Sequence, residues 1–218
     1  MSVLQWEKNL LRLLLVRHGE TAWNATGWFQ GQMDIGLNVA TERQAVAVAE
    51  RLASEEIHAI YASDLRRAYD TAVMIAARHP VAVQADPRLR EINFGAWQGL
   101  TYAHMQEQDP EGLAAWNADR ANRCPPGGES LSDVASRLTS LLDEVRLRNV
   151  DQTVVLVSHG GTVRLVLCLL LGHPLSAYWQ FEVDNTAIAE VELQDRGPVL
   201  IRWNDVHHLT DGHRQSVF

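Results

Sequence analysis

Two polar residues whose side chains can do chemistry stand side by side near the start of the chain, in the stretch LLLVRHGETAWN that covers Leu13–Asn24. The four apolar residues before Arg17 predict a short buried strand, and Gly19 supplies the turn that leaves it. Arg17 and His18 therefore lie at the carboxyl end of a strand, the edge at which open α/β sheets bind ligands. Arginine offers a forked cation to an anion, and histidine can act as a nucleophile or carry a proton. The pair predicts a phosphate site, although an arginine paired with a surface carboxylate beside a strand-end histidine would give the same pattern.

Two further segments bring basic residues to the same predicted edge. Arg66 opens the helix expected after the second strand, where a cation opposes the helix dipole at a cost of roughly a few tenths of a kcal/mol unless an anion sits there. His159 ends a later strand, and Gly160 and Gly161 leave the N–H groups of the next helix open to an anion. A solvated surface arginine beside Arg67 is the alternative for Arg66. Together the residues favour a phosphate pocket that needs no metal ion, because side chains supply the positive charge.

The composition limits the class of partner. The chain has 218 residues, of which 46% are hydrophobic and 21% charged, and its formal net charge is -8. That length fills one α/β core, so we expect a single domain over residues 1–218. The negative charge argues against nucleic acid as the main partner, and any anion site must be a local concentration of basic residues. Two cysteines, Cys124 and Cys168, are too few for a disulfide framework.

Neither the first residues of the chain nor its apolar runs predict secretion or a membrane span. The first residues, MSVLQWEKNLLR, lack the apolar core and the cleavage site of a secretory signal. The longest apolar run, LVLCLLLG from Leu165, is too short to cross a bilayer. We therefore expect a cytoplasmic protein without a membrane partner.

Strands and helices alternate along the sequence. Strands are expected at residues 11–16, 59–62, 81–84, 153–157, 186–193 and 199–204, and the turn DRGP joins the last two as a hairpin. Helices are expected from Thr41, from Ser63 and Asp64, from Ser130 and over residues 162–171. This alternation predicts a three-layer α/β/α fold in which helices enclose a mostly parallel central sheet and the hairpin adds an antiparallel strand. Residues 86–99 are expected to form a loop, and residues 101–120 carry weak helical patterns interrupted by Pro110 and Gly112. The segment of about residues 86–128 is expected to form a lid-like insertion over the sheet edge.

Five motifs follow one another along the chain: RHGETAWN at residues 17–24, SDLRRAYDTA at 63–72, REINFGAWQGLT at 90–101, PPGGES at 125–130 and VSHGGTVR at 157–164. In this order they resemble the histidine phosphatase superfamily, in its phosphoglycerate-mutase-like branch, over about residues 13–208. The resemblance implies the phosphoglycerate-mutase-like fold and an enzyme that hydrolyses phosphomonoesters without a cofactor.

The resemblance also implies catalytic roles. His18 would be the nucleophile that forms a phosphohistidine, while Arg17, Arg66 and His159 would hold the phosphoryl oxygens. Glu91 matches the general acid of the family, which gives a proton to the leaving alkoxide and later activates water. An ion pair between Glu91 and a neighbouring arginine at the surface is the alternative.

Secondary contacts transfer less directly. Asn24 and the backbone of Gly31 resemble further contacts around the same phosphate. Gly36 and Thr41 stand where the family usually has proline and glycine, so the resemblance does not predict the path of this loop.

The motifs also favour one branch of the superfamily. Gly160 follows His159 where acid phosphatases and phytases of the superfamily carry Asp, and EINFGAWQG from Glu91 differs from the ERHYGALQG-like stretch of the mutases. The pattern is more similar to the small phosphatases, which include alpha-ribazole phosphatase and broad-specificity phosphatases. The expected partner is a small phosphomonoester, of unknown identity. The alternatives are a cofactor-dependent phosphoglycerate mutase and a non-catalytic phospho-ligand-binding module, although a binding module is expected to lack His18 or Glu91.

Overall fold

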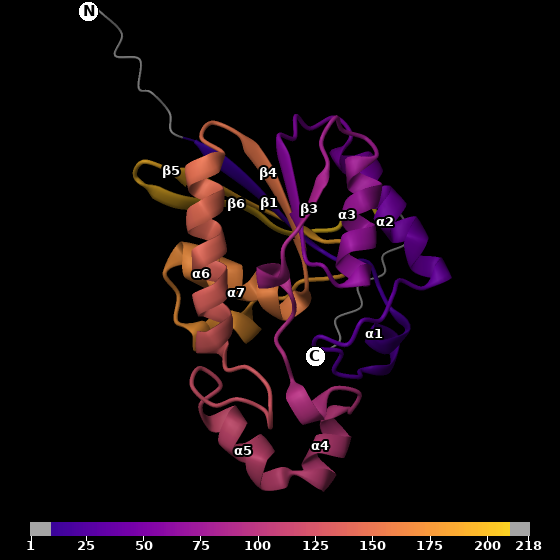
Figure 1. Ribbon diagram of the computed structural model, residues 1–218, viewed down its shortest axis with the longest axis vertical. Helices are drawn as coiled ribbons and strands as arrows, with labels where there is room; N and C mark the ends of the chain where they lie inside the picture. The colour runs from indigo at the N-terminus through magenta and orange to yellow at the C-terminus, as the bar shows by residue number, and fades with distance from the viewer. Residues whose placement is uncertain (1–9, 210–218) are drawn as a thin grey trace, which may run out of the picture.

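The core of the molecule is one six-stranded sheet with the strand order β3-β2-β4-β1-β5-β6 (Figure 1). The computed structural model describes residues 10–209, so the two ends of the expected domain lie outside the described residues. The strands are β1 (Leu11–Arg17), β2 (Ala59–Ala62), β3 (Val83–Ala85), β4 (Thr153–Ser158), β5 (Ile188–Gln194) and β6 (Gly197–Asp205). Strands β1 to β4 pair in parallel, whereas β5 runs antiparallel to β1 and forms the predicted hairpin with β6. The mostly parallel sheet with an antiparallel element is confirmed.

The sheet is covered by helices on both faces. The helices are α1 (Ala22–Thr26), α2 (Val39–Leu52), α3 (Arg66–Ala76), α4 (Tyr102–Gln108), α5 (Pro110–Ala118), α6 (Leu131–Arg148) and α7 (Gly160–Leu171). Leu14 and Val16 of β1 pack under α2 and α3, and Leu13 and Leu15 pack with α6 and α7. Because alternate side chains of a strand point to opposite faces, a run of four apolar residues in β1 serves both cores.

Two helices start elsewhere than the capping patterns predict. Helix α2 begins at Val39, two residues before Thr41. Helix α3 begins at Arg66, with Leu65 at the N-cap and no capping side chain. Asp64 instead forms an ion pair with Arg90, so its carboxylate serves a distant segment and not the helix end.

The insertion between β3 and α6 extends away from the sheet. Helices α4 and α5 lie together below the body of the molecule in Figure 1. Trp116 of α5 is buried and makes edge-to-face contacts with Phe94 and Trp97, at centroid distances of 6.2 and 5.6 Å. Phe94 in turn meets Phe29 at 4.9 Å. The insertion therefore packs against the loop that follows α1 through an aromatic cluster.

A search of the described residues finds no helix with both the length and the apolar content that crossing a membrane requires.

Candidate functional site

Two buried histidines meet at the carboxyl ends of the two central strands. The parallel register of β1 and β4 pairs Arg17 with Ser158, so His18 and His159 follow at the same level. Their rings lie 5.1 Å apart between centroids, edge to face. His18 is 3% exposed and His159 is completely buried. The sequence prediction that the two histidines share one edge is confirmed.

The ring of His18 is fixed in one tautomer. Its Nδ1 lies 2.6 Å from the carbonyl oxygen of Gly19. A carbonyl only accepts hydrogen bonds, so Nδ1 carries the proton and Nε2 keeps its lone pair. Burial, followed by the charges of Arg67 and Arg17, holds the pKa of His18 well below 6.5. The side chain is therefore a neutral imidazole at pH 7, with Nε2 available as a nucleophile.

Arg67, and not Arg66, lies against His18. The Nε of Arg67 donates to His18 Nε2 at 3.3 Å, and its Nη1 and Nη2 donate to the carbonyls of Met33 and Gly31, each at 2.7 Å. Arg67 is 1% exposed, whereas the side chain of Arg66 is exposed and its backbone N–H donates to Asp34. The expectation that Arg66 faces the crevice is thus wrong.

The orientation of α3 explains why Arg67, and not Arg66, lies against His18. Arg67 lies four residues before Thr71, whose hydroxyl donates to the Arg67 carbonyl, and both residues are buried. Residues four apart share a helix face, so the arginine that precedes Thr71 by one turn faces inward and its neighbour faces outward. In the sequence, Thr71 stands on the apolar face formed by Ala68, Ala72 and Ile75, and this position is the signal that could have identified Arg67.

Arg17 contributes a second guanidinium to the site. Its Nη1 donates to the carbonyl of Val183 at 2.6 Å, whereas its buried Nε has no hydrogen-bond partner. Gly160 allows this approach, because a Cβ at that position would lie 3.4 Å from Arg17 Nε. Burial first, and then the charge of Arg164, lowers the pKa of Arg17 to about 10. Arg17 and Gly160 thus lie where the sequence predicts, next to the start of α7.

His159 stands at the N-cap of α7. Its Nε2 lies 2.8 Å from the hydroxyl of Ser63, and its Nδ1 is buried without a hydrogen-bond partner. Burial, and then the charges around it, of which Arg67 is the strongest, lower the pKa of His159 well below 6.5. The ring is neutral at pH 7 and leaves one nitrogen for a ligand.

Glu91 is held by the first turn of α7. Its Oε2 accepts the N–H of Gly161 at 3.0 Å, and its Oε1 accepts the N–H of Thr162 at 3.1 Å. The alternative of an ion pair with a neighbouring arginine is wrong, since Arg88 binds Asp86 and Arg90 binds Asp64. The structure therefore places Glu91 at the same helix end as His159.

Glycine at position 161 lets this carboxylate come close to the helix end. A Cβ on Gly161 would lie 2.7 Å from Glu91 Oε1 and 2.8 Å from Ile92 Cδ1. The backbone of Glu91 is held as well, because its carbonyl accepts from Gln32 Nε2 and Arg137 Nη2, each at 3.1 Å. Both the carboxylate and the peptide of Glu91 are thus fixed before any ligand binds.

Asn24 and Gly31 contact the site indirectly. The Oδ1 of Asn24 accepts the N–H of Thr21 at 2.9 Å in the capping box of α1. The Gly31 carbonyl accepts from Arg67, and a Cβ on Gly31, whose φ is +52°, would collide with Gln98. Asn24 thus caps α1 and the Gly31 carbonyl holds Arg67, and neither residue is hydrogen-bonded to His18.

The segment that leads into β5 supports the site as well and was not predicted from the sequence. The amide of Asn185 donates to the His18 carbonyl at 3.0 Å, and the N–H of Thr186 donates to the Arg17 carbonyl at 3.1 Å. Thr186 adopts a φ of +57°, which is rare for a residue other than glycine, asparagine or aspartate. The polar DNT triplet immediately before an apolar strand was the only signal for this segment.

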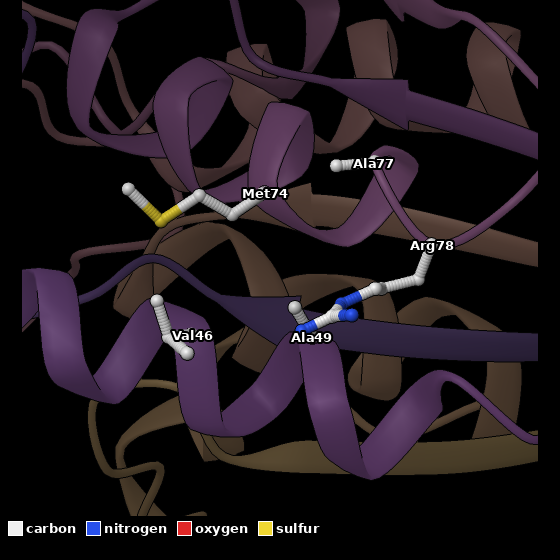
Figure 2. Close-up of a pocket in the computed structure, with 5 residues that line it drawn as sticks. All are labelled: Val46, Ala49, Met74, Ala77 and Arg78. Atoms are coloured by element: carbon white, nitrogen blue, oxygen red, sulfur yellow. The ribbon is translucent and has the colours of Figure 1, made fainter.

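A surface hollow between α2 and α3 does not belong to this site. It has a volume of about 310 Å³ and is lined by Val46, Ala49, Met74, Ala77 and Arg78. Figure 2 shows Met74 of α3, and Arg78 just after the end of α3, on the side that faces Val46 and Ala49 of α2. Apart from the guanidinium of Arg78, its lining has no group that could act as nucleophile, acid or base.

The arrangement at the β1 and β4 ends suits transfer of a phosphoryl group. A neutral imidazole presents Nε2 to the guanidinium of Arg67, the charge of Arg17 also acts on this ring, and the Glu91 carboxylate lies at the adjacent helix end. Within residues 10–209, no three imidazole, thiol or carboxylate groups are placed to hold a metal ion.

Comparison with known proteins points to the same chemistry. Residues 13–206 match the model of the histidine phosphatase superfamily, branch 1. The chain is 37% identical over 200 residues to phosphoserine phosphatase 1 of Hydrogenobacter thermophilus, covering 92% of this chain and 95% of that protein. It is 38% identical over 208 residues to a metal-independent phosphoserine phosphatase of Arabidopsis thaliana, covering 94% of this chain and 85% of that protein. The solved structure of the alpha-ribazole phosphatase of Shigella flexneri superposes with a TM-score of 0.81 at 27% identity, covering 89% of this chain and 96% of that chain.

The two adjacent arginines give a matched pair of variants. We expect Arg67→Met to weaken binding of inorganic phosphate about tenfold or more, since a hydrogen bond to a charged group is worth about 1.5–3 kcal/mol. Arg66→Met removes the same charge from the next residue and is expected to bind phosphate as the wild type does. Titration calorimetry at fixed ionic strength measures both. A larger loss for Arg66→Met than for Arg67→Met would contradict the placement.

Proposed function

Because this chain belongs to branch 1 of the histidine phosphatase superfamily, we propose that it hydrolyses phosphomonoesters of small metabolites through a phosphohistidine on Nε2 of His18. The observation that carries the proposal is the bond between His18 Nδ1 and the Gly19 carbonyl, which leaves the Nε2 lone pair beside Arg67. The phosphoserine phosphatases and the alpha-ribazole phosphatase among its relatives support a phosphorylated metabolite as substrate.

In the first step, the phosphoryl oxygens bind to Arg17, Arg67 and His159. Nε2 of His18 attacks phosphorus while the bond to the ester oxygen breaks. The imidazole becomes positively charged as the N–P bond forms, and the Nδ1–H bond to the Gly19 carbonyl stabilises that charge. Glu91 in its protonated form gives a proton to the ester oxygen, because an alkoxide is a poor leaving group, and it is thereby left as the carboxylate that acts in the second step.

In the second step, water attacks the phosphohistidine. The Glu91 carboxylate takes a proton from that water, the N–P bond breaks, and inorganic phosphate leaves with His18 restored. The two steps divide one difficult displacement into two easier ones. No step needs a metal ion, because guanidiniums and backbone N–H groups stabilise the charge of the transition state.

The insertion at residues 86–128 is proposed to cover the substrate as a lid. Its aromatic packing against Phe29 joins the insertion to the loop that holds Arg67, so a movement of the insertion would displace that loop. The single domain and the cytoplasmic location stay predictions of the sequence analysis.

The nucleophile can be identified by trapping. Wild-type protein mixed with ³²P-labelled p-nitrophenyl phosphate and quenched in base is expected to carry label on His18, since phosphohistidine survives base. His18→Ala should take up no label and lose turnover. His207→Ala, a change at an exposed histidine, serves as control. Label on a serine or aspartate, or full turnover by His18→Ala, would overturn the proposal.

Metal independence is tested by exhaustive treatment with a chelator. We expect the rate of phosphate release to stay unchanged after dialysis against EDTA and 1,10-phenanthroline, because the site supplies its positive charge from arginines. Orthovanadate should inhibit, since it mimics five-coordinate phosphorus and binding should favour the transition state. Activity that is lost on chelation and restored by zinc or magnesium would be the contrary result.

The role of Glu91 is isolated by changing the leaving group. Glu91→Gln keeps the shape but has no proton to give, so phosphorylation by an alkyl phosphate should slow by about 10²- to 10⁴-fold. With p-nitrophenyl phosphate, whose phenolate leaves unaided, the burst of p-nitrophenolate in single turnover should slow far less. Later hydrolysis of the phosphohistidine should slow with both substrates. Equal losses in the two burst rates would assign Glu91 to binding or folding.

A further inference from the structure

Ser63 is a completely buried serine whose hydroxyl contacts the ring of His159, and the two reaction steps above make no use of it. It is the first residue after β2, as His18 and His159 are the first residues after β1 and β4. Strand β2 pairs in parallel with β4, and the N–H of Ser63 donates to the Val157 carbonyl at 3.0 Å. The register of the sheet therefore places Ser63 beside His159.

The hydrogen bonds of Ser63 determine the direction in which its hydroxyl points. A serine hydroxyl has one proton to donate and two lone pairs that accept. The Oγ of Ser63 accepts the N–H of Leu65 at 3.3 Å and lies 2.8 Å from His159 Nε2. Within residues 10–209 these are its hydrogen-bond partners, so Nε2 is the acceptor for its proton. A buried donor that goes unused is unfavourable, and Ser63 therefore donates to His159.

This direction decides which nitrogen of His159 carries the ring proton. Burial holds the pKa of His159 well below 6.5, so the ring is neutral at pH 7 and has one N–H and one lone pair. Because Nε2 accepts from Ser63, the proton lies on Nδ1. Nδ1 is also the ring nitrogen that is buried without a hydrogen-bond partner. His159 therefore holds an unused N–H donor, in a ring that lies 5.1 Å from that of His18 between centroids.

The opposite tautomer would conflict with a bound phosphoryl group. It would present the lone pair of Nδ1 to a negatively charged oxygen and would leave the serine proton without an acceptor. With Ser63 as donor, the two histidines share one tautomer but use opposite nitrogens. His18, whose Nδ1 proton is held by the Gly19 carbonyl, offers the lone pair of Nε2 to phosphorus. His159 offers the proton of Nδ1 to a phosphoryl oxygen.

We propose that Ser63 is a positioning residue, whose hydroxyl holds His159 in the Nδ1–H tautomer so that this N–H donates to an oxygen of the transferred phosphoryl group. The inference rests on the proposed function, because that oxygen reaches Nδ1 only when phosphorus lies at His18 Nε2. A donor fixed before the reaction stabilises the charge of the transition state without reorienting. Without the serine proton, the ring can take the Nε2–H tautomer, in which this donor is lost.

The tautomer can be read by NMR of ligand-free protein labelled with ¹⁵N in its histidine rings. Two-bond correlations between ¹H and ¹⁵N distinguish a ring nitrogen that carries a proton from one that does not. The signals of His159 are identified by their absence from His159→Gln. In the wild type at pH 7, Nδ1 of His159 should be protonated and Nε2 should not. A wild-type ring protonated at Nε2, or at both nitrogens, would overturn the inference without any variant of Ser63.

Two serine variants assign the tautomer to its cause. In Ser63→Ala the Nε2–H tautomer of His159 should become populated, because Nε2 has lost its donor. Ser158→Ala removes another buried hydroxyl, which donates to the Leu89 carbonyl and not to a ring, so it is the matched control. It should leave the tautomer unchanged. A ring in Ser63→Ala identical to that of the control would contradict the role of Ser63.

Kinetic measurements show what the tautomer contributes to the reaction. Ser63→Ala should lower kcat for p-nitrophenyl phosphate about tenfold or more, the effect of one hydrogen bond to a charged group. Ser63→Thr and Ser63→Val both add a methyl group at this buried position, but only Ser63→Thr keeps the hydroxyl. Ser63→Thr should therefore have the higher kcat by several-fold. Equal values for these two variants would show that the hydroxyl is not what the reaction needs.

A double-mutant cycle tests whether Ser63 acts through His159. Ser63→Ala should have almost no effect on kcat/KM in the His159→Ala background, because the ring that the serine orients is absent. The same fold loss in both backgrounds would assign Ser63 a role independent of His159 and overturn the inference.

Failure of the inference differs from failure of the proposed function, since the tautomer is measured without substrate. A protein that releases phosphate through labelled His18 but carries the His159 proton on Nε2 refutes the role of Ser63 alone. A protein that releases no phosphate from any phosphomonoester tested, or that converts 3-phosphoglycerate into its 2-isomer with little phosphate release, refutes the proposed hydrolysis.

Discussion

The parallel pairing of β1 with β4 is the constraint on which the site depends. Its register pairs Arg17 with Ser158, and the N–H of His18 then donates to the Ser158 carbonyl at 2.8 Å. Both strands are buried on both faces, so a one-residue slip would exchange the two cores and is strongly disfavoured. The fixed register also fixes the positions of the two histidines, since each is the first residue after its strand. Their burial, in turn, keeps both imidazoles neutral at pH 7.

Around this pair, the fold concentrates positive charge in a protein whose net charge is negative. Arg17, Arg67 and Arg164 all have lowered pKa values, for which burial is the largest cause. Such a cluster is unfavourable in the free protein, and a bound dianion removes much of that cost, so part of the folding free energy is stored as affinity for anions. Backbone carbonyls offset part of the cost of burying these charges, since Arg67 donates to two carbonyls and Arg17 to a third.

The parts of the structure that the sequence predicts are those set by local pattern. Apolar runs identify β1 and β4, and the turn before Pro198 identifies the hairpin. The choice between Arg66 and Arg67 fails because it depends on where α3 begins, and Ser63 and Asp64 cap nothing. The side chain of Ser63 binds His159 and that of Asp64 binds Arg90, and these contacts form only when segments distant in the sequence come together. The segment at Asn185 was missed for the same reason.

The position of Glu91 shows how the two halves of the site are joined. Its carboxylate is bound by N–H groups of α7, while its carbonyl is bound by Gln32 and Arg137. Both of these side chains also donate to Glu129 of the PPGGES motif, at 3.2 and 3.1 Å. The loop that carries the carboxylate lies at the start of the insertion and is held by three separate segments, α7, the loop at Gln32 and α6. Any motion of α4 and α5 that reaches Glu129 would reach Glu91 through Gln32 and Arg137, whereas His18 is held by the sheet and would stay in place.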